Sequence, residues 1–314
     1  MLHWFGGRGQ GVVLLQPSYA RRRLWQVLTK RVALVEYRSA CRNVGKAGEL
    51  ADINGTEAAA RVADVLLLFT DGPESLGVSA IARRLGLSKA VVHRILRTLT
   101  DRGLLAADPV SRGYRLGPAS AALGARALRE SKLRTVAMPV LRELQAATDE
   151  TTTISARVPD GRVYLDQVES TQEIKMTVEV GRRFPLHAGG SSTCILAFLP
   201  PREQEAVLSD ELTAMTHRTV TDVAVLRARL AEVRATGHAH SVGERQSGAA
   251  SVAAPVFGFD GTVVGAISVC GPADRVDDAA RERFAPLLSD AADRISRALG
   301  WRGGLPDDAD RESA

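Results

Sequence analysis

The feature that most constrains the fold is a run of helix caps and glycine breaks between residues 78 and 105. Ser79 can cap a short helix that ends at Gly86, and Ser88 can cap a longer helix that runs to about Asp101. Two helices joined by a three-residue turn that contains glycine form the DNA-binding unit whose second helix enters the major groove. This stretch therefore predicts a helix-turn-helix rather than an ordinary pair of helices.

The flanking residues complete the unit. A preceding apolar-periodic segment can be capped by Thr56 or Asn54 and is ended by Asp71-Gly72-Pro73. After Gly103, two short apolar segments surround the turn-forming residues 108–113, which predicts a β-hairpin wing. Residues 56–117 therefore form one winged helix-turn-helix.

The longer helix has two distinct faces. Val92, Ile95, Leu96 and Leu99 recur at helical spacing and are expected in the core, while the opposite face carries small and basic residues. Cations on that face can neutralise phosphate or reach guanine edges. The expected DNA contacts, including those of the wing, are Ser79, Ser88, Lys89, Ala90, Val91, His93, Arg94, Arg97, Arg112 and Tyr114.

Charge is unevenly distributed along the chain. The 314 residues have a formal net charge of +5, but residues 1–46 alone hold nine Lys and Arg against one acid. Residues 56–117 hold nine bases and six acids, and residues 118–314 are net acidic. The tail is either a basic arm along nucleic acid or a disordered extension. The DNA-binding prediction therefore depends on the local basic module, not on the global charge.

The second half of the sequence predicts an α+β domain. A linker helix over 118–131 and a helix over 136–148, with Met138-Pro139 in its first turn, precede strands at 151–158, 162–168 and 174–180. Helices follow at 192–198, 202–208 and 223–236, then strands at 251–257 and 262–270 and a final helix at 277–299. Strands with turn-rich connections and separate helices favour an antiparallel sheet flanked by helices.

The expected organisation has five parts. They are a basic, disordered extension and linker (1–55), the winged helix-turn-helix (56–117), a linker helix (118–135), an effector-binding domain (136–300) and a flexible tail (301–314).

Several motifs resemble the IclR-type transcriptional regulators. They are VSAIARRLGLSKAVVHRILRTLTDRGLL (78–105), YRLG (114–117), VGRRFPLHAG (180–189), ILAFLP (195–200), HRTVTDVAVLRARLAEVRATGHAHSVGER (217–245) and VAAPVFGFDGTVVGAISVCGP (252–272). The resemblance implies a winged helix-turn-helix joined to a GAF-like effector-binding domain. It also implies dimers or tetramers on palindromic operators, repression as the commoner outcome, and small organic acids or aromatics as effectors.

The resemblance also implies an effector site around the Gly/Ser/Thr loop at 188–194, whose backbone N–H groups and hydroxyls suit a small acid. Two family features are absent: Ser192-Thr193-Cys194 stands where relatives carry Gly-Lys-Ala, and Ser241 where they often carry an acid. Without that lysine, a less cationic pocket is expected. The expected effector contacts are Gly190, Ser191, Ser192, Thr193, Cys194, Ser241, Ser251, Ser268 and Cys270.

Two other classes of function compete with this interpretation. Cys194 at a helix N-terminus could have a lowered pKa and serve a GAF-like enzyme or a thiol redox sensor. His238 and His240 could begin a metal site. Neither has a supporting motif, so we expect no enzyme activity, metal or cofactor. Three irregularly spaced cysteines and the lack of a long apolar run favour a cytoplasmic protein without a membrane span.

Overall fold

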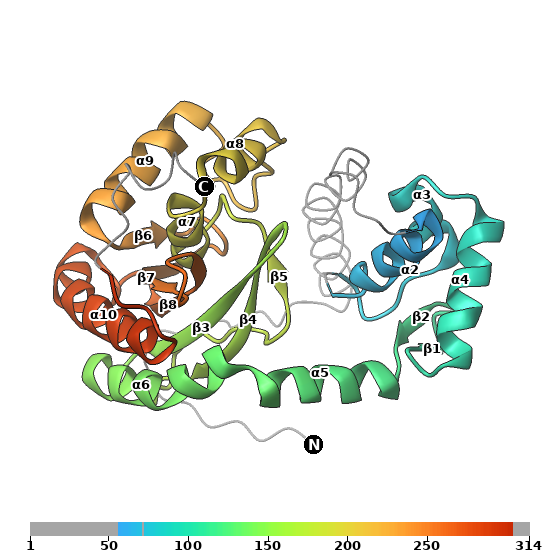
Figure 1. Cartoon of the computed structure of the whole chain (residues 1–314), viewed down its shortest axis with the longest axis horizontal. Coiled ribbons are helices and arrows are strands. Elements are labelled where there is room, and N and C mark those ends of the chain that lie inside the picture. The colour runs from blue at the N-terminus through green and yellow to red at the C-terminus, as the bar shows by residue number, and fades with distance from the viewer. Residues whose placement is uncertain (1–55, 71, 304–314) are drawn as a thin grey trace, which may run out of the picture. The chain divides into compact units, whose positions relative to one another are not determined.

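The computed structural model describes residues 56–70 and 72–303. The predictions for the extension at 1–55, including its basic arm, lie outside the described residues. The N-terminal module and the C-terminal domain are described separately below, and their elements are labelled in Figure 1.

The N-terminal module is a three-helix unit with a two-stranded wing. Its elements are α2 (Glu57–Leu67), α3 (Val78–Leu85), α4 (Lys89–Asp101), β1 (Leu105–Ala107) and β2 (Tyr114–Leu116). The two strands pair antiparallel, as the hairpin pattern predicts. One buried cluster joins the inner faces of the three helices, and it includes Val65, Ile81, Val92 and Leu96.

The caps explain where these helices begin and end. Thr56 and Ser88 accept hydrogen bonds from the backbone N–H groups of Ala59 and Val91, as predicted. Gly86 adopts a left-handed conformation (φ 65°) and ends α3. The prediction that Ser79 caps α3 is wrong. Gly77 is the N-cap, two residues earlier, and it directly follows the backbone bridge between Leu76 and Tyr114.

Two helices connect the module to the second domain. The linker helix α5 (Pro118–Glu130) ends before Ser131, whose side chain caps α6 (Lys132–Thr148) by accepting from Arg134. The predicted start of the second helix at residue 136 is therefore one turn too late. Pro139 lies inside α6 rather than in its first turn.

The C-terminal domain is built on a six-stranded antiparallel sheet in the order β5-β4-β3-β8-β7-β6. Its strands are β3 (Thr151–Val158), β4 (Gly161–Val168), β5 (Arg183–Phe184), β6 (Ala239–Val242), β7 (Ala249–Phe257) and β8 (Val263–Pro272). The remaining helices are α7 (Gly190–Ala197), α8 (Pro201–Ser209), α9 (Val223–Thr236) and α10 (Asp278–Ala298). This is the α+β architecture predicted from the sequence.

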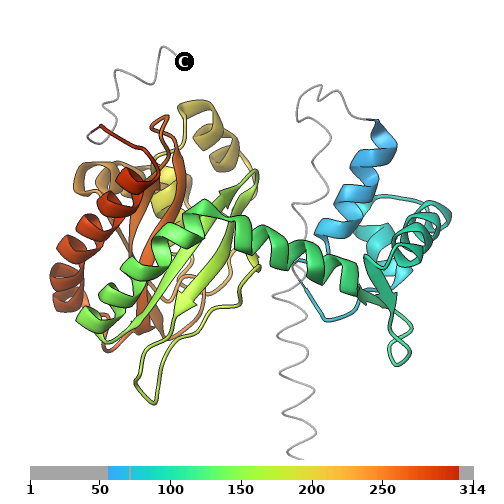
Figure 2. The same cartoon turned by 60° about the horizontal axis from the view of Figure 1, so that its bottom comes forward.

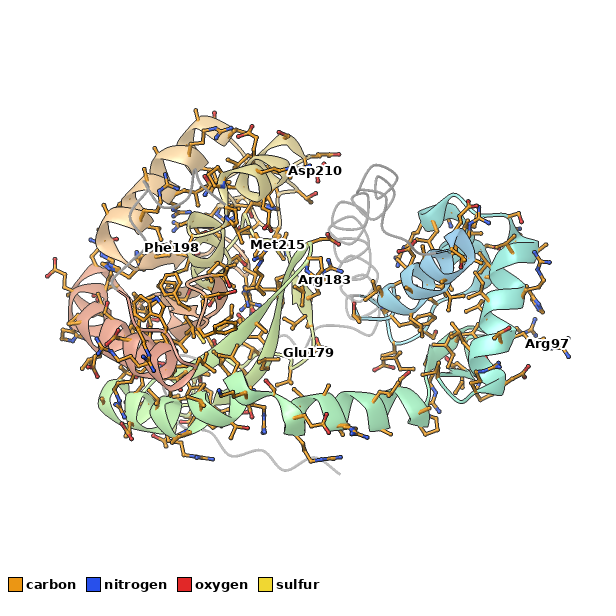
Figure 3. All side chains as sticks on the ribbon, in the orientation of Figure 1. Arg97, Glu179, Arg183, Phe198, Asp210 and Met215 are labelled. Carbon is orange, nitrogen blue, oxygen red and sulfur yellow. The ribbon has the colours of Figure 1, made fainter. Side chains whose placement is uncertain are left out.

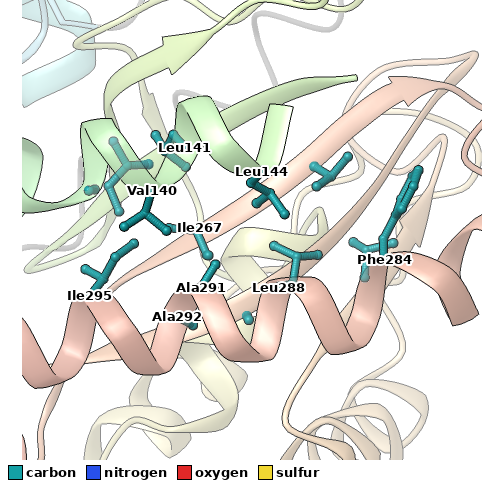
Figure 4. Close-up of a cluster of buried hydrophobic side chains, with 14 of the residues drawn as sticks. Val140, Leu141, Leu144, Ile267, Phe284, Leu288, Ala291, Ala292 and Ile295 are labelled. Carbon is teal, nitrogen blue, oxygen red and sulfur yellow. The ribbon is translucent and has the colours of Figure 1, made fainter. Parts of the chain in front are cut away.

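Side chains alternate between the two faces of the sheet along each strand, and each face packs in a different hydrophobic core. Ile267 and Val269 of β8 pack with α6 and α10, where Leu141, Leu144 and Leu288 are buried (Figure 4). Ala266, one position away, packs instead with α7 and α9. Helices therefore cover both faces of the sheet (Figure 2).

The predicted strand at 174–180 does not form. This segment runs beside β4 but is held by a side chain: the Gln167 amide donates to the Val178 carbonyl (3.1 Å) and accepts from its N–H (2.7 Å). Ile174 is 72% exposed, so the apolar pattern that suggested a strand does not bury it. The short strand β5 pairs with β4 instead.

Ordered packing extends past residue 300. The Trp301 ring stacks on Phe257, with ring centroids 5.2 Å apart. The tail expected from residue 301 therefore begins with a packed residue, and its remainder from residue 304 lies outside the described part.

Candidate functional site

The outward face of α4 carries a row of exposed cations. Lys89, Arg94 and Arg97 are exposed, as are Ala90 and His93 between them. Arg97 points away from the three-helix core (Figure 3). Among the described residues, none of the three cations makes an ion pair. Their charges are therefore available to an external anion.

Four of the predicted DNA contacts have a second structural role or a different position. Val91 and Tyr114 are half-buried and pack against the helical core, so each offers only part of its surface outward. Ser79 is exposed in the first turn of α3. The Ser88 hydroxyl oxygen caps α4 by accepting a hydrogen bond from the Val91 backbone N–H at 3.3 Å.

The wing presents one cation at its tip. The Asp108 carboxylate accepts from the backbone N–H groups of Val110 and Ser111 and from the Ser111 hydroxyl. These hydrogen bonds, that of the Ser111 hydroxyl first, lower the pKa of Asp108. Arg112 follows with φ at 54° and an exposed side chain. The turn therefore holds a basic residue outward in a conformation that glycine adopts more readily.

The C-terminal domain contains a polar cavity between the N-terminus of α7 and the sheet. Its empty space, counted together with the open solvent at its mouth, is 420 Å³. The cavity is lined by Arg162, Tyr164, Met176, Gly189, Gly190, Ser191, Ser241, Glu244, Arg245, Gln246, Ala249, Ala250, Ser251, Ser268 and Cys270.

The N-terminus of α7 is set close against β7 by glycine. A Cβ at Gly190 would lie 2.8 Å from the Ser251 hydroxyl oxygen, so only glycine permits this approach. No side chain caps α7. The first N–H groups of the helix and its dipole are therefore available to a negative group at the cavity wall.

Arg162 is the residue that sequence reasoning missed. It is only 1% exposed, and its guanidinium donates to three hydroxyl oxygens: Ser192 (2.7 Å), Ser155 (2.8 Å) and Tyr164 (3.1 Å). Among the described residues, no carboxylate forms an ion pair with it. Burial is the main cause that lowers the pKa of Arg162, and the charge of Arg245 adds to it. The cavity wall therefore contains a desolvated positive charge without a counter-charge.

The single carboxylate among the lining side chains is already engaged. Glu244 pairs with Arg229 at 2.6 Å and also accepts from the Gly189 backbone at 3.2 Å. It therefore orients the loop before α7 instead of neutralising Arg162. The lysine that relatives carry is absent here, but Arg162 and Arg245 bring positive charge to the cavity from other elements.

The structure brings together some of the predicted effector residues and separates others. Gly190, Ser191, Ser241, Ser251, Ser268 and Cys270 line the cavity. Three others do not line it: Ser192 accepts from Arg162, Thr193 donates back to Gly189, and Cys194 lies in the core behind α7.

The environment of Cys194 contradicts the reactive-thiol hypothesis. Its side chain is fully buried, and burial raises the pKa of the thiol instead of lowering it. A thiolate is the nucleophile in cysteine chemistry. The alternative enzyme or redox sensor therefore loses its proposed nucleophile.

The histidine pair has no third ligand. His238 precedes β6 and its Nδ1 lies 3.1 Å from the Thr236 carbonyl, while His240 is half-buried in the strand. No cluster of three potential ligands occurs within residues 56–70 and 72–303. In the same residues, no helix is long and apolar enough to cross a membrane.

Comparisons with known proteins match both halves of this architecture. The IclR helix-turn-helix domain matches residues 58–109, and the bacterial transcriptional regulator IclR C-terminal domain matches residues 125–297. The HTH-type transcriptional regulator BhcR of Paracoccus denitrificans is 33% identical over 271 residues, which cover 85% of this chain and 97% of BhcR.

Two solved structures extend the likeness to three dimensions. An IclR transcriptional regulator from Silicibacter sp. TM1040 shares 32% identity and a TM-score of 0.71, over 79% of this chain and 98% of that one. An IclR homologue from Microbacterium hydrocarbonoxydans, solved in complex with 4-hydroxybenzoate, shares 28% identity and a TM-score of 0.61, over 77% of this chain and 99% of that one. The chain is therefore a helix-turn-helix transcriptional regulator and belongs to the IclR family.

Proposed function

We propose that α4 lies in the major groove of an operator. Its small first-turn residues allow close approach, and Lys89, Arg94 and Arg97 supply contacts to phosphates and base edges. Arg112 of the wing contacts the adjacent backbone. The support is the exposure of these cations without an intramolecular acid partner.

The operator is palindromic, and two copies of the chain bind its half-sites. A single module buries only ~600–1,000 Å² on DNA, which is too little for tight specific binding. The linker helix α5 supports self-association, because none of its residues is buried and Leu123 is 61% exposed. Pairs of such dimers give the tetramers typical of the family.

The cavity at α7 binds a small anionic effector, an organic acid or an aromatic acid. The observation that carries this proposal is Arg162, a buried guanidinium with only neutral hydroxyl partners. A carboxylate in the cavity would supply the missing counter-charge and also accept from the N-terminus of α7. The 4-hydroxybenzoate in the Microbacterium homologue is an acid of this class.

Effector binding changes the affinity for the operator. A ligand that binds one arrangement of the two DNA-binding modules better than another shifts the protein toward that arrangement. We propose that the unliganded protein represses transcription in the cytoplasm and that the anion releases it.

Thermal-shift measurements on the full chain test the effector class. The probes are a set of small organic acids, each paired with its neutral amide. Acids that raise the melting temperature where their amides do not would support the proposal, and those acids should also change operator affinity in fluorescence anisotropy. Amides that stabilise as well as acids would contradict the anionic class.

A further inference from the structure

The cavity wall carries more positive charge than one carboxylate would neutralise. Its charged lining residues are Arg162, Arg245 and Glu244. The Glu244 carboxylate is neutralised by Arg229 at 2.6 Å. The two guanidiniums on the wall therefore remain without an acidic partner among the described residues.

Both guanidiniums lie against the same pair of aromatic rings. Tyr164 and Phe184 pack edge to face, with centroids 5.5 Å apart. The Arg162 guanidinium lies 4.3 Å from the Tyr164 centroid, and that of Arg245 lies 4.8 Å from the Phe184 centroid. The rings hold two like charges near each other, and cation–π contact offsets only part of the cost. The Coulomb repulsion between the two charges contributes to the lowered pKa of Arg162.

The side chains of Arg162 and Arg245 are held in place to different degrees. Arg162 directs three of its five N–H donors to hydroxyl oxygens, so two donors remain for a ligand. Arg245 is half-buried at the cavity and is held by ring contacts without a hydrogen bond among the described residues. Arg162 thus offers a fixed inner anion site, and Arg245 a second, adjustable one.

We infer that the effector is a small dianion, a dicarboxylate, with one carboxylate at Arg162 and the other at Arg245. This inference rests on the proposed function and narrows it from an anion to an anion with two charged groups. A dicarboxylate neutralises both guanidiniums and removes their mutual repulsion, whereas a monocarboxylate leaves one of them unpaired. The hydroxyls of Ser191, Ser241 and Ser268 on the wall can donate to the remaining oxygens.

Isothermal titration of the full chain with matched acids tests the inference. The pairs are butanoate with butanedioate, pentanoate with pentanedioate, and benzoate with benzene-1,3-dicarboxylate, all at one ionic strength. We expect the better dicarboxylate to bind at least about tenfold more tightly than its monocarboxylate partner. Equal affinity within every pair would overturn the dianion inference and leave the anionic class standing. Binding of the neutral amides alone would contradict the proposed function itself.

Two variants locate the second carboxylate. Arg245→Gln should reduce dicarboxylate affinity by a larger factor than monocarboxylate affinity, so that the preference for the dicarboxylate is lost. Arg202→Gln removes an exposed cation of α8 outside the cavity and should change neither. Arg245 is only half-buried, so its replacement leaves the fold intact, which the melting temperature checks. An equal loss of both ligand types in Arg245→Gln, or full retention of the dicarboxylate preference, would overturn the inference.

Discussion

The arginines of α4 and Arg162 of the cavity are the same residue type in opposite environments. Arg94 and Arg97 are exposed on a helix face, whereas Arg162 is only 1% exposed beneath α7. An exposed guanidinium keeps its hydration, so its charge costs the fold little free energy. A row of such groups suits a long polyanion, and mobile salt ions compete with the contacts between the two. A buried guanidinium has lost its hydration and needs an anion at one defined place. Exposure therefore separates a surface for DNA from a site for one small molecule.

The largest expected difference between the two sites is in the salt dependence of their binding affinities. If the dimer makes 6–10 phosphate contacts, operator affinity falls by about 10³–10⁵ between 50 and 200 mM salt. Effector binding at the enclosed cavity should change far less over the same range, because buried pairs are weakly screened. Anisotropy and calorimetric titrations at several salt concentrations measure the two slopes. If operator affinity and effector affinity depended equally on salt, the distinction between an exposed DNA surface and a buried effector site would be contradicted.

Removing cations from α4 should have the next largest effect. In the double variant Lys89→Ala and Arg94→Ala, each lost contact is worth about 1–3 kcal/mol, so operator affinity should fall by about 30-fold or more. Both side chains are exposed and outside the helical core, so the melting temperature should not change.

The matched control for this variant is Arg202→Ala, which removes a cation from the other domain and should leave operator affinity unchanged. Wild-type affinity in the double variant would remove α4 as the DNA-reading helix.

The thiol of Cys270 on the cavity wall allows burial at the effector cavity to be tested through the pH dependence of stability. Burial raises the pKa of Cys270 from 9.0 to about 11. Between these values the unfolded chain releases the proton and the folded chain retains it. The contribution to stability is therefore complete below pH 9 and is lost as pH rises toward 11, at up to about 1.4 kcal/mol per pH unit.

Urea unfolding of the wild type and of Cys270→Ser across this range measures that loss. The variant should show a shallower decline, because it lacks this thiol while every other titrating group is retained. Equal declines would mean that Cys270 is not desolvated.

The wing should show the smallest effect. Arg112 adopts φ 54°, a conformation that glycine adopts without strain. Arg112→Gly therefore removes one exposed cation without destabilising the turn, and operator affinity should weaken by about threefold to tenfold, uniformly across DNA sequences. Competition with operator and random DNA measures this. A loss confined to the operator would assign base recognition to the wing instead.

Sequence reasoning succeeded where local interactions decide the structure. The caps at Thr56 and Ser88 and the break at Gly86 depend on residues close in the chain. It failed at residues 174–180, where a side chain of β4 replaces the strand pairing. That contact joins distant residues, and no periodicity reveals it.

The candidate site was only partly predictable for the same reason. The loop at 188–194 has the composition of an anion-binding helix start, and its Gly190 and Ser191 reach the cavity wall. The other four predicted residues on the wall lie on β6, β7 and β8 and were expected only from the family resemblance. Arg162 begins the strand predicted at 162–168, directly after Asp160-Gly161, and nothing in the local pattern indicates that its side chain is buried. Its buried position depends on tertiary contacts with Ser192 of α7 and Ser155 of β3. One usable signal existed, since Arg162 and Tyr164 lie two apart on a strand and share a face.

Operator affinity of the wild type and of Arg162→Gln, titrated with an acid that stabilises the wild type, tests whether the buried guanidinium recognises the effector. Both proteins should bind the operator equally without ligand, since Arg162 is remote in sequence from the DNA-binding module and the glutamine amide keeps a donor for the neighbouring hydroxyls. With the acid, the wild type should change its operator affinity and the variant should not. A variant with the same melting temperature that responded to the acid as the wild type does would contradict the claim that the buried guanidinium recognises the effector.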